Sequence, residues 1–320
     1  MPSQDSGTDA QSFFRGRTVR ILVGVTAGGG QDLYARIMAP YLSRHLAGQP
    51  NVIVENMPGA GGLIAATYLA RRADADSLTI GLLTFQAVTA QLTSTTPAFE
   101  MRSLPIIGSP ADDAAICVFA RERQFSLEAW QGGRTPRMGM SPPGSITASY
   151  TRLFAGALAL PVHPVAGYQG TSEIKAAMAS GEIDGACVSR ASFMASFQPT
   201  SDYDVVVQSS TGAAGLAGVP NAESLVGSNE ARSLLAVVTA LARLARFYAV
   251  PAGTPEDRVA MLRVAFDETM RDREFLASAQ AARLEIRPQT PAEITAQIEA
   301  LLTTSPEMRR RIVPMLSAGS

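Results

Sequence analysis

Five short segments rich in glycine, serine and threonine each follow a predicted β-strand. They are residues 26–31, 56–62, 84–86, 141–147 and 167–171. Backbone N–H groups and hydroxyls in such segments can donate hydrogen bonds to an anion, and each bond to a charged group contributes about 1.5–3 kcal/mol. In open α/β sheets, ligands bind beyond the carboxyl ends of the strands. One such segment predicts only a tight turn, but five at equivalent positions favour a binding site for a small carboxylate.

The first of these segments lies between a strand and a helix. An apolar run, 19–25, predicts a buried strand, and Gly28, Gly29 and Gly30 end it. Asp32 is the expected N-cap of the next helix. The first N–H groups of a helix are unpaired and favour anions. Because Asp32 brings its own negative charge, we expect this segment to hold a carboxylate together with the segment 56–62, through backbone N–H groups and water.

The common catalytic and cofactor motifs are missing from the sequence. Gly28–Gly30 lacks the G-x-G-x-x-G spacing of dinucleotide sites, and the only lysine, Lys175, is not in a phosphate-binding loop motif. The run Gly139–Pro143 has proline where a nucleophile elbow needs glycine. His45 and His163 are too few and too far apart to form a metal cluster. We therefore expect no catalytic residue, no cofactor and no metal.

Composition excludes some classes of partner. The chain has 320 residues, which predicts two domains, and its net charge of −1 provides no basic field for nucleic acid. No run approaches the roughly 20 apolar residues of a membrane span. The polar N-terminal residues lack the apolar region of a signal peptide, which indicates either a cytoplasmic protein or a mature chain. Cys117 and Cys187 lie in apolar runs, and we expect two buried free thiols rather than a bridge.

Strands and helices alternate from residue 18 onward, which predicts an α/β protein with largely parallel sheets. The predicted strands are 19–25, 51–55, 78–83, 105–108, 114–120, 137–140, 162–165, 203–207, 246–250 and 284–286, and residues 181–188 are predicted to form a turn and a further strand. Thr254 is the predicted N-cap of a helix with Pro255 in its first position. The same signature recurs at Thr290 and at Ser305.

Two segments resemble the hallmark segments of a known family. VTAGGGQDLYARIMAPYL and VIVENMPGAGGLIAATYLA are similar to those of the tripartite tricarboxylate transporter substrate-binding proteins, the Bug or TctC family. The second segment, with Asn56 and the run 58–62, is the more specific. Residues 141–144, 167–170 with 181–184, and 252–255 also fit in order and spacing. The resemblance covers about residues 17–312.

This resemblance implies an α/β, type II periplasmic-binding-protein fold, in which two lobes joined by crossing strands close on a ligand. We expect a flexible segment at 1–16, a first lobe at 17–118 and 251–320, and a second lobe at 119–250. The crossings are expected near 116–120 and 247–251.

The resemblance also implies the ligand-binding residues. In the first lobe they are Thr26, Ala27, Gly28, Gly29, Gly30, Gly59, Ala60 and Gly61, around one carboxylate. In the second lobe they are Ser145, Ile146, Thr147, Gly170 and Thr171. Asp184 matches a family acid and is either structural or an acceptor for ligand hydroxyls or amines. Phe85 either floors the ligand pocket or belongs to the core, and Arg190 either meets a distal carboxylate or is solvated.

The function implied is that of an extracytoplasmic receptor without catalytic activity. It captures a di-, tri- or aromatic carboxylate and delivers it to the membrane permease subunits of a tripartite transporter. We expect a periplasmic monomer whose signal peptide is not part of this sequence. Gln169 stands where the family often has lysine, which removes a cation and leaves the ligand open. The alternatives are an enzyme using Asp32 or Asp184 as base, and a ligand-sensing partner of a signalling protein.

Overall fold

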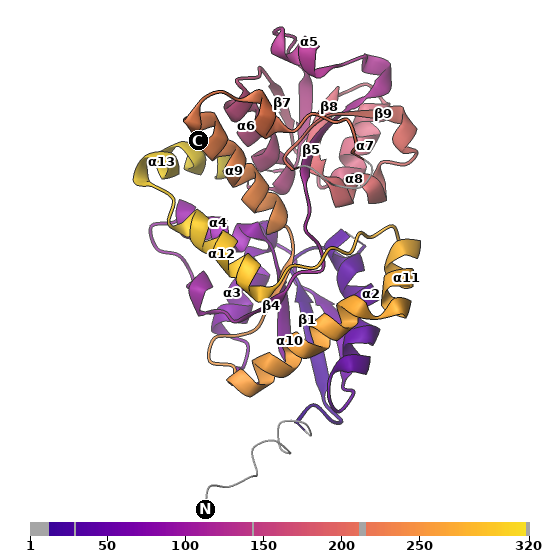
Figure 1. Ribbon diagram of the computed structural model, residues 1–320, viewed down its shortest axis with the longest axis vertical. Helices are drawn as coiled ribbons and strands as arrows, with labels where there is room; N and C mark the ends of the chain where they lie inside the picture. The colour runs from indigo at the N-terminus through magenta and orange to yellow at the C-terminus, as the bar shows by residue number, and fades with distance from the viewer. Residues whose placement is uncertain (1–12, 29, 143, 211–215, 318–320) are drawn as a thin grey trace, which may run out of the picture. The chain divides into compact units, whose positions relative to one another are not determined.

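The structure, a computed structural model, describes residues 13–28, 30–142, 144–210 and 216–317. The chain divides into two compact units (Figure 1). Unit 1 comprises the described residues up to Asp112 together with Arg246–Glu299. Unit 2 comprises Asp113–Ala245 and the described residues from Ala300 onward. Each unit has its own five-stranded sheet flanked by helices, so the predicted α/β class is confirmed.

The elements of unit 1 are β1 (Thr18–Val23), α2 (Gly30–His45), β2 (Asn51–Asn56), η1 (Ala60–Gly62), α3 (Leu63–Arg71), β3 (Thr79–Leu83), α4 (Phe85–Thr93), η2 (Met101–Ser103), β4 (Ile106–Gly108), β10 (Phe247–Ala249), α10 (Glu256–Arg271), α11 (Arg273–Ala281) and α12 (Pro291–Leu302), whose end belongs to unit 2. Those of unit 2 are β5 (Ala115–Ala120), η3 (Arg121–Arg123), α5 (Leu127–Gln131), β6 (Arg137–Met140), α6 (Ile146–Leu158), β7 (His163–Ala166), α7 (Thr171–Ala179), β8 (Gly185–Ser189), α8 (Arg190–Ser196), η4 (Thr200–Asp202), β9 (Tyr203–Gln208), η5 (Ala222–Leu225), α9 (Asn229–Arg243) and α13 (Pro306–Leu316).

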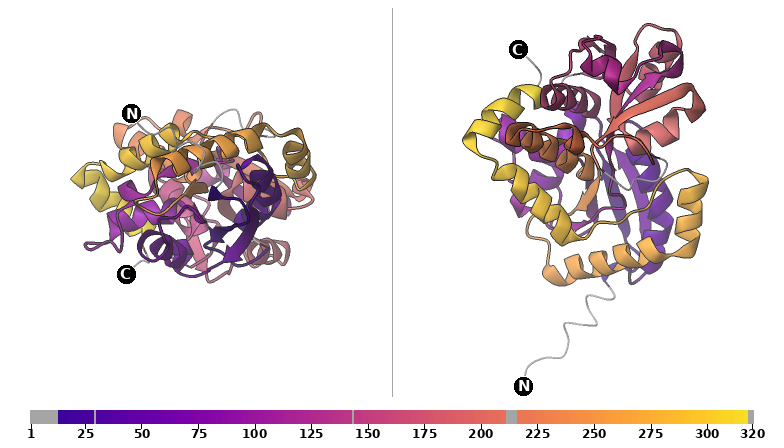
Figure 2. Two further views of the ribbon diagram at one scale, coloured as in Figure 1. Left: turned by 90° about the horizontal axis from the view of Figure 1, so that it is seen from below. Right: turned by 45° about the horizontal axis from the view of Figure 1, so that its top comes forward.

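The two sheets share one topology. Their strand orders are β2-β1-β3-β10-β4 and β7-β6-β8-β5-β9. Figures 1 and 2 draw the strands of both sheets as arrows. In each sheet three neighbouring strands are parallel, and the fourth, β10 or β5, runs antiparallel to both of its neighbours. The sheets are therefore mixed rather than largely parallel. Crossover helices impose parallel pairing, and neither β10 nor β5 follows a helix of its own sheet.

Three local predictions differ from the structure. Residues 284–286 form no strand among the described residues, and only Gln289 bridges to Ser109 there. Phe14, predicted to lie in a flexible segment, is fully buried. Helix α10 is capped by Pro255, while the hydroxyl of Thr254 donates to Pro251 O at 2.7 Å. The bridge of Gln289 and the burial of Phe14 depend on tertiary contacts, whereas Thr254 is engaged in a local turn with Pro251.

The boundaries of the units also differ from those of the predicted lobes. The chain divides after residues 112, 245 and 299, whereas the predicted divisions follow residues 118 and 250. The last residues join unit 2 because α13 packs against α6. There Arg152 Nη1 donates to Ser317 O at 3.1 Å, and a Cβ on Gly156 would lie 2.8 Å from Cε of Met315.

The core of unit 1 holds β1 against α2 and α10. Val19, Ile21 and Val23 alternate along β1, are fully buried and belong to one cluster with Leu42 of α2 and Leu262 of α10. Side chains two residues apart lie on one face of a strand, so this alternation selects the face that the helices cover. The packing positions the amino end of α2 next to the carboxyl end of β1.

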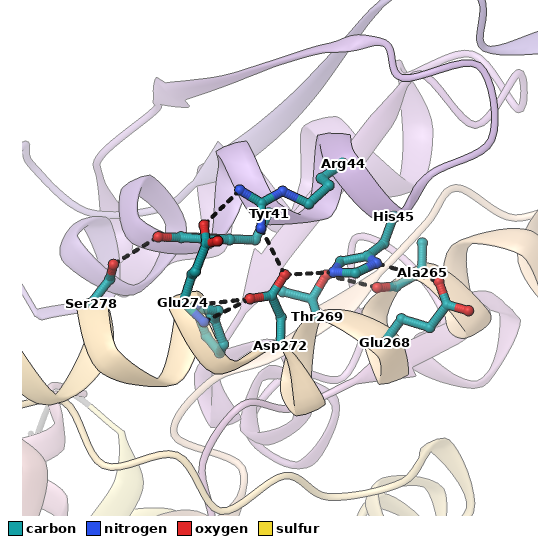
Figure 3. Close-up of polar contacts among 10 residues, drawn as sticks. Tyr41, Arg44, His45, Ala265, Glu268, Thr269, Asp272, Glu274 and Ser278 are labelled. Carbon is teal, nitrogen blue, oxygen red and sulfur yellow. Dashed lines mark hydrogen bonds and ion pairs between the residues drawn. The ribbon is translucent and has the colours of Figure 1, made fainter.

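Polar contacts at the other end of α2 join it to α10 and α11 (Figure 3). His45 Nε2 lies 2.8 Å from Asp272 Oδ2, and Arg44 donates to Asp272 at 3.2 Å and to Glu274 at 2.8 Å. Asp272 also begins α11, where its Oδ1 accepts the N–H groups of Glu274 and Phe275. Since a helix is rigid, anchoring its carboxyl end also orients its amino end.

Cys117 and Cys187 form a disulfide, so the prediction of two free thiols is wrong. They are directly opposite each other in the antiparallel pair of β5 and β8. Their sequence separation is 70 residues. The pairing depends on the register of the two strands, which the composition of each strand does not determine.

Candidate functional site

Three loops of unit 1 leave the sheet at the same edge. The first glycine loop (residues 24–29) follows β1, the second glycine loop (57–62) follows β2, and Thr84 follows β3. Because β1 is parallel to both β2 and β3, the carboxyl ends of the three strands lie side by side. The predicted site residues here are Thr26, Ala27, Gly28, Gly30, Gly59, Ala60 and Gly61. All but the half-buried Gly59 are exposed, whereas Gly29 lies outside the described residues.

Asp32 organises the first glycine loop from inside. Helix α2 begins at Gly30, so Asp32 is in its first turn and is not the N-cap that the sequence predicts. Its side chain is buried and accepts hydrogen bonds from Gly28 N at 2.8 Å, Arg36 Nε at 2.8 Å and Asn56 Nδ2 at 2.9 Å. Burial favours the neutral acid, but these bonds outweigh it and hold the pKa of Asp32 below its ordinary value.

Asn56 and Arg36 connect the two glycine loops. Asn56 Nδ2 also donates to Val25 O at 3.0 Å, and its Oδ1 accepts from Arg36 Nη2 at 2.8 Å. The end of β2 is thus tied to the loop after β1 by side chains as well as by Met57 N, which donates to Val23 O at 2.8 Å. Arg36 is not among the residues predicted from the sequence to form the site. Its position four residues after Asp32 on one helix face was the available signal.

The second glycine loop needs glycine at three positions. Gly59, Gly61 and Gly62 have φ values of 131°, 65° and 94°, a region that residues with a Cβ rarely adopt, and Ala60 between them also has a positive φ, of 48°. A Cβ on Gly24 would lie 2.7 Å from Cα of Gly62, so the two loops touch backbone to backbone. This close approach gathers the exposed backbone of both loops at one point.

The loop after β3 completes this edge of unit 1. The hydroxyl of Thr84 donates to Oε1 of Gln86, and a Cβ on Gly61 would lie 3.4 Å from Cγ of Gln86. Gln86, which the sequence analysis did not single out, therefore borders the second glycine loop. Phe85 is 1% exposed and lies in the first turn of α4. Its side chain belongs to the buried residues rather than to the exposed part of the loop.

Unit 2 places hydroxyl groups at the equivalent edge of its sheet. The loop after β6 leads into α6, whose N-cap Ser145 accepts from Ala148 N at 3.3 Å. Thr147 Oγ1 is buried, accepts from Ser141 N at 2.8 Å and lies 3.3 Å from Ser145 Oγ. Ile146 is half-buried at the first position of the helix. Ser145, Ile146 and Thr147, which are predicted to bind the ligand, thus lie at the amino end of α6.

The loop after β7 leads into α7, with Gly170 as its N-cap and Thr171 as its first residue. Glu173 Oε2 accepts from Gln169 N at 2.8 Å, so an acid of the helix's own first turn binds the loop. Since β7 is parallel to β6, Gly170 and Thr171 lie at the same edge of the sheet as Ser145. Both residues are half-buried.

Asp184 lies at the opposite end of this sheet. It precedes β8 and binds Arg137, the first residue of β6, through Arg137 N at 2.8 Å and Nη2 at 2.8 Å. Burial is again outweighed by these bonds, so the pKa of Asp184 lies below its ordinary value. The ligand loops follow the other ends of β6 and β7. This geometry supports the structural role for Asp184 and separates it from the other predicted site residues.

Arg190 is 3% exposed, so the expectation of a solvated side chain is wrong. It begins α8 directly after β8, at the same edge of the sheet as Ser145. Its backbone N donates to Ala114 O at 2.8 Å. The apolar strand that precedes it was the signal for burial. Unit 2 therefore holds a buried cation at its loop edge.

Some kinds of site find no support in the described part of the chain. No group of three or more histidine, cysteine, aspartate or glutamate side chains could hold a metal ion there. Among the described helices, none is long and apolar enough to span a bilayer.

Two curated proteins match parts of the sequence. A UPF0065 protein of Cupriavidus necator is 48% identical over 56 residues, covering 18% of this chain and 16% of that protein. A UPF0065 protein of Agrobacterium vitis is 29% identical over 190 residues, covering 56% of this chain and 52% of that protein. This chain therefore spans about half of the length of the second relative and less of the first. No protein-family model matches the chain.

Solved structures match nearly the whole chain. The periplasmic binding protein BugD has a TM-score of 0.70 and 19% identity, covering 95% of this chain and 99% of BugD. MatC of Rhodopseudomonas palustris with bound malate has a TM-score of 0.66 and 19% identity, covering 94% and 99%. An R. palustris protein with adipate has a TM-score of 0.71 and 18% identity, covering 95% and 99%.

The chain has the fold of the Bug and TctC solute-binding proteins. The predicted resemblance and the type II periplasmic-binding-protein fold are thereby confirmed. At this level of identity the solved structures show the fold of the chain. The assignment of ligand-binding residues stays a prediction.

Proposed function

We propose that this protein is an extracytoplasmic receptor that binds a small organic carboxylate and delivers it to the permease of a tripartite transporter. The observation that carries the proposal is the contact between the two glycine loops, where Gly24 and Gly62 meet backbone to backbone. Their exposed residues provide uncharged backbone donors at one edge of the sheet. Relatives of the same fold hold malate or adipate.

The loops of unit 2 supply the second set of ligand groups in this proposal. Ser145, Thr147 and Thr171 contribute hydroxyls, and the buried guanidinium of Arg190 lies at the same edge of the sheet. Hydroxyls can accept as well as donate, so they suit the hydroxyl groups of a ligand as well as its oxyanions. We infer that unit 1 binds a carboxylate common to many ligands and that unit 2 selects among them.

An enzyme with Asp32 or Asp184 as general base is disfavoured. Both carboxylates are ion-paired with an arginine, and both have a lowered pKa. A general base works best when its pKa is near the working pH. The solved relatives of this fold are binding proteins, which agrees with a receptor.

A thermal-shift and calorimetry series tests the proposal. Malate, adipate, citrate and benzoate are compared with adipamide, the neutral analogue of adipate. A ligand at about 100 times its Kd adds roughly 2.7 kcal/mol of stability, which raises the melting temperature by several degrees. We expect a carboxylate to do so and adipamide to do nothing. Stabilisation by a neutral solute alone would overturn the carboxylate proposal.

A matched pair of variants locates the site. Ala27 is exposed in the first glycine loop, so Ala27→Glu adds a charge there without filling the core. Ala27→Gln has nearly the same size without the charge. We expect Ala27→Glu to weaken carboxylate binding at least about tenfold, by like-charge repulsion at close range, and Ala27→Gln to change it much less. Equal binding by both variants would place the ligand elsewhere.

A further inference from the structure

Unit 2 contains a pocket at the end of its sheet opposite to Ser145 and Gly170. The pocket has a volume of about 400 Å³ and lies between η3, the end of α7 and η4. Ala120, which lines it, donates from its N–H to Asp184 O at 3.1 Å, beside the first residues of β6 and β8. Pockets for small ligands measure roughly 300–1,000 Å³. None of the residues predicted to bind the carboxylate lines this pocket.

One alanine and a tyrosine line the pocket. Ala179 is exposed there, and Tyr203 is only 7% exposed. Met178, which also borders the pocket, is fully buried. The ring of Tyr203 is fixed edge-on to Phe197, with ring centroids 5.1 Å apart. No described residue forms a hydrogen bond with its hydroxyl. Burial and the neighbouring charge of Asp202 raise the pKa of Tyr203, so the hydroxyl stays neutral and can accept a hydrogen bond.

The charges around the pocket favour a cation. Arg121 is neutralised by Asp204, since its Nε donates to Asp204 Oδ1 at 3.0 Å. Glu122 pairs with Arg123 only at 3.8 Å, and Asp202 Oδ1 accepts from Ser201 Oγ only at 3.4 Å, so both carboxylates at the pocket are weakly engaged. The carboxyl end of α7 also lies at the pocket, and the end of a helix carries a partial negative charge.

We propose that this pocket binds an alkylammonium group, either of a free amine or of a lysine side chain presented by another protein. The hydrocarbon part packs on Ala179 and on the exposed part of Tyr203. The ammonium group, which has three donors and no acceptor, binds the carboxylates of Asp202 and Glu122. The inference is independent of the carboxylate site, which lies at the other end of the sheet.

The test follows the full-length protein by two-dimensional amide NMR during titration with n-butylammonium. We expect saturable shifts of the amides of Ala179, Asp202 and Tyr203. Two compounds of similar length serve as controls, 1-butanol without a charge and butyrate with the opposite charge. N-acetyl-lysine methylamide tests whether a lysine side chain in a peptide can enter. Binding by n-butylammonium alone indicates a free amine, and binding by both indicates that a lysine side chain also fits.

Variants then test the assignment. We expect Asp202→Asn to weaken binding about fivefold and the double variant Glu122→Gln, Asp202→Asn to abolish it, while Asp74→Asn, an exposed acid of unit 1, has no effect. Carboxylate binding should be unchanged in all of them. Equal shifts by 1-butanol and n-butylammonium, or unchanged affinity in the double variant, would overturn the proposal.

Discussion

In both units an acid in the first turn of a helix holds the loop that precedes the helix, but the two loops are held with different rigidity. At the amino ends of α2 and α7, an acid accepts the backbone N–H four residues before it: Asp32 from Gly28 and Glu173 from Gln169. Asp32 is 2% exposed and has three donor residues, whereas Glu173 is exposed. The loop of unit 1 is therefore held firmly by its own side chains, and the loop of unit 2 is held by a single exposed acid. Under the proposed function, this difference suits a receptor that binds a common group with unit 1 and a variable group with unit 2.

The largest expected effect concerns unit 2, whose sheet contains a covalent link. The disulfide Cys117–Cys187 closes a loop of 70 residues, which removes about 4 kcal/mol of unfolded-state entropy in the chain-entropy model. We expect Cys117→Ala with Cys187→Ala to lower the free energy of unfolding by about this amount in urea. Reduction of the native protein is the control and should match the variant. If the urea midpoint were unchanged in the double variant and in the reduced protein, the disulfide would not stabilise the fold.

The second largest effect is expected at Asp32 and is compared with that at Glu173. Asp32→Ala leaves Arg36, Asn56 and Gly28 N without their shared acceptor, and we expect a loss of about 3 kcal/mol in the free energy of unfolding. Carboxylate affinity should fall as well, because the first glycine loop loses its support. Urea unfolding and calorimetry measure the two effects. If Asp32→Ala cost no more than Glu173→Ala, the difference between the loops would not exist.

The stability of unit 1 is expected to depend on pH, because an acid contacts each end of α2: Asp32 at its amino end and Asp272 at its carboxyl end. Burial alone would raise the pKa of Asp272, but its hydrogen bonds with His45 and with the N–H groups of α11 lower the pKa to about 2. The unfolded pKa is about 3.9, so this stabilisation is complete above about pH 5 and is lost as the pH falls through 4 to 2. It amounts to about 2 kcal/mol.

The measurement compares the native protein with Asp272→Asn between pH 6 and pH 2. Most other carboxylates are common to both proteins, so their contributions cancel in the difference. We expect the native protein to lose about 2 kcal/mol more than the variant over this range. Parallel curves would show that Asp272 does not anchor α2 electrostatically.

The smallest effect is expected at the loop of unit 2. Glu173→Gln keeps an acceptor near Gln169 N but removes the charge on an exposed side chain, so we expect a change of less than about 0.5 kcal/mol in stability. Its effect on ligand preference should exceed its effect on stability, and competition between malate and adipate measures that. A large loss of stability would show that this loop is as rigid as that of unit 1.

Much of the local structure could be predicted from the sequence. The cap at Ser305 accepts from Met308 N, and Thr290 exchanges hydrogen bonds with Glu293 as the start signal implies. Strand and helix positions agree closely because the alternation of apolar residues and the placement of glycine act over a few residues. For the same reason, Asp184 could be noticed as a conspicuous acid but not located at one end of the sheet.

By itself, the sequence determined the α/β class and the glycine loops after β1 and β2, since strand propensity and left-handed backbone are local properties. Only the tertiary structure decided the pairing of Cys117 with Cys187, the antiparallel strand in each sheet and the burial of Arg190. It also decided that Asp32 binds Asn56 and supports both loops. These features join residues far apart in the chain, and their partners are set by the register of strands and the packing of helices.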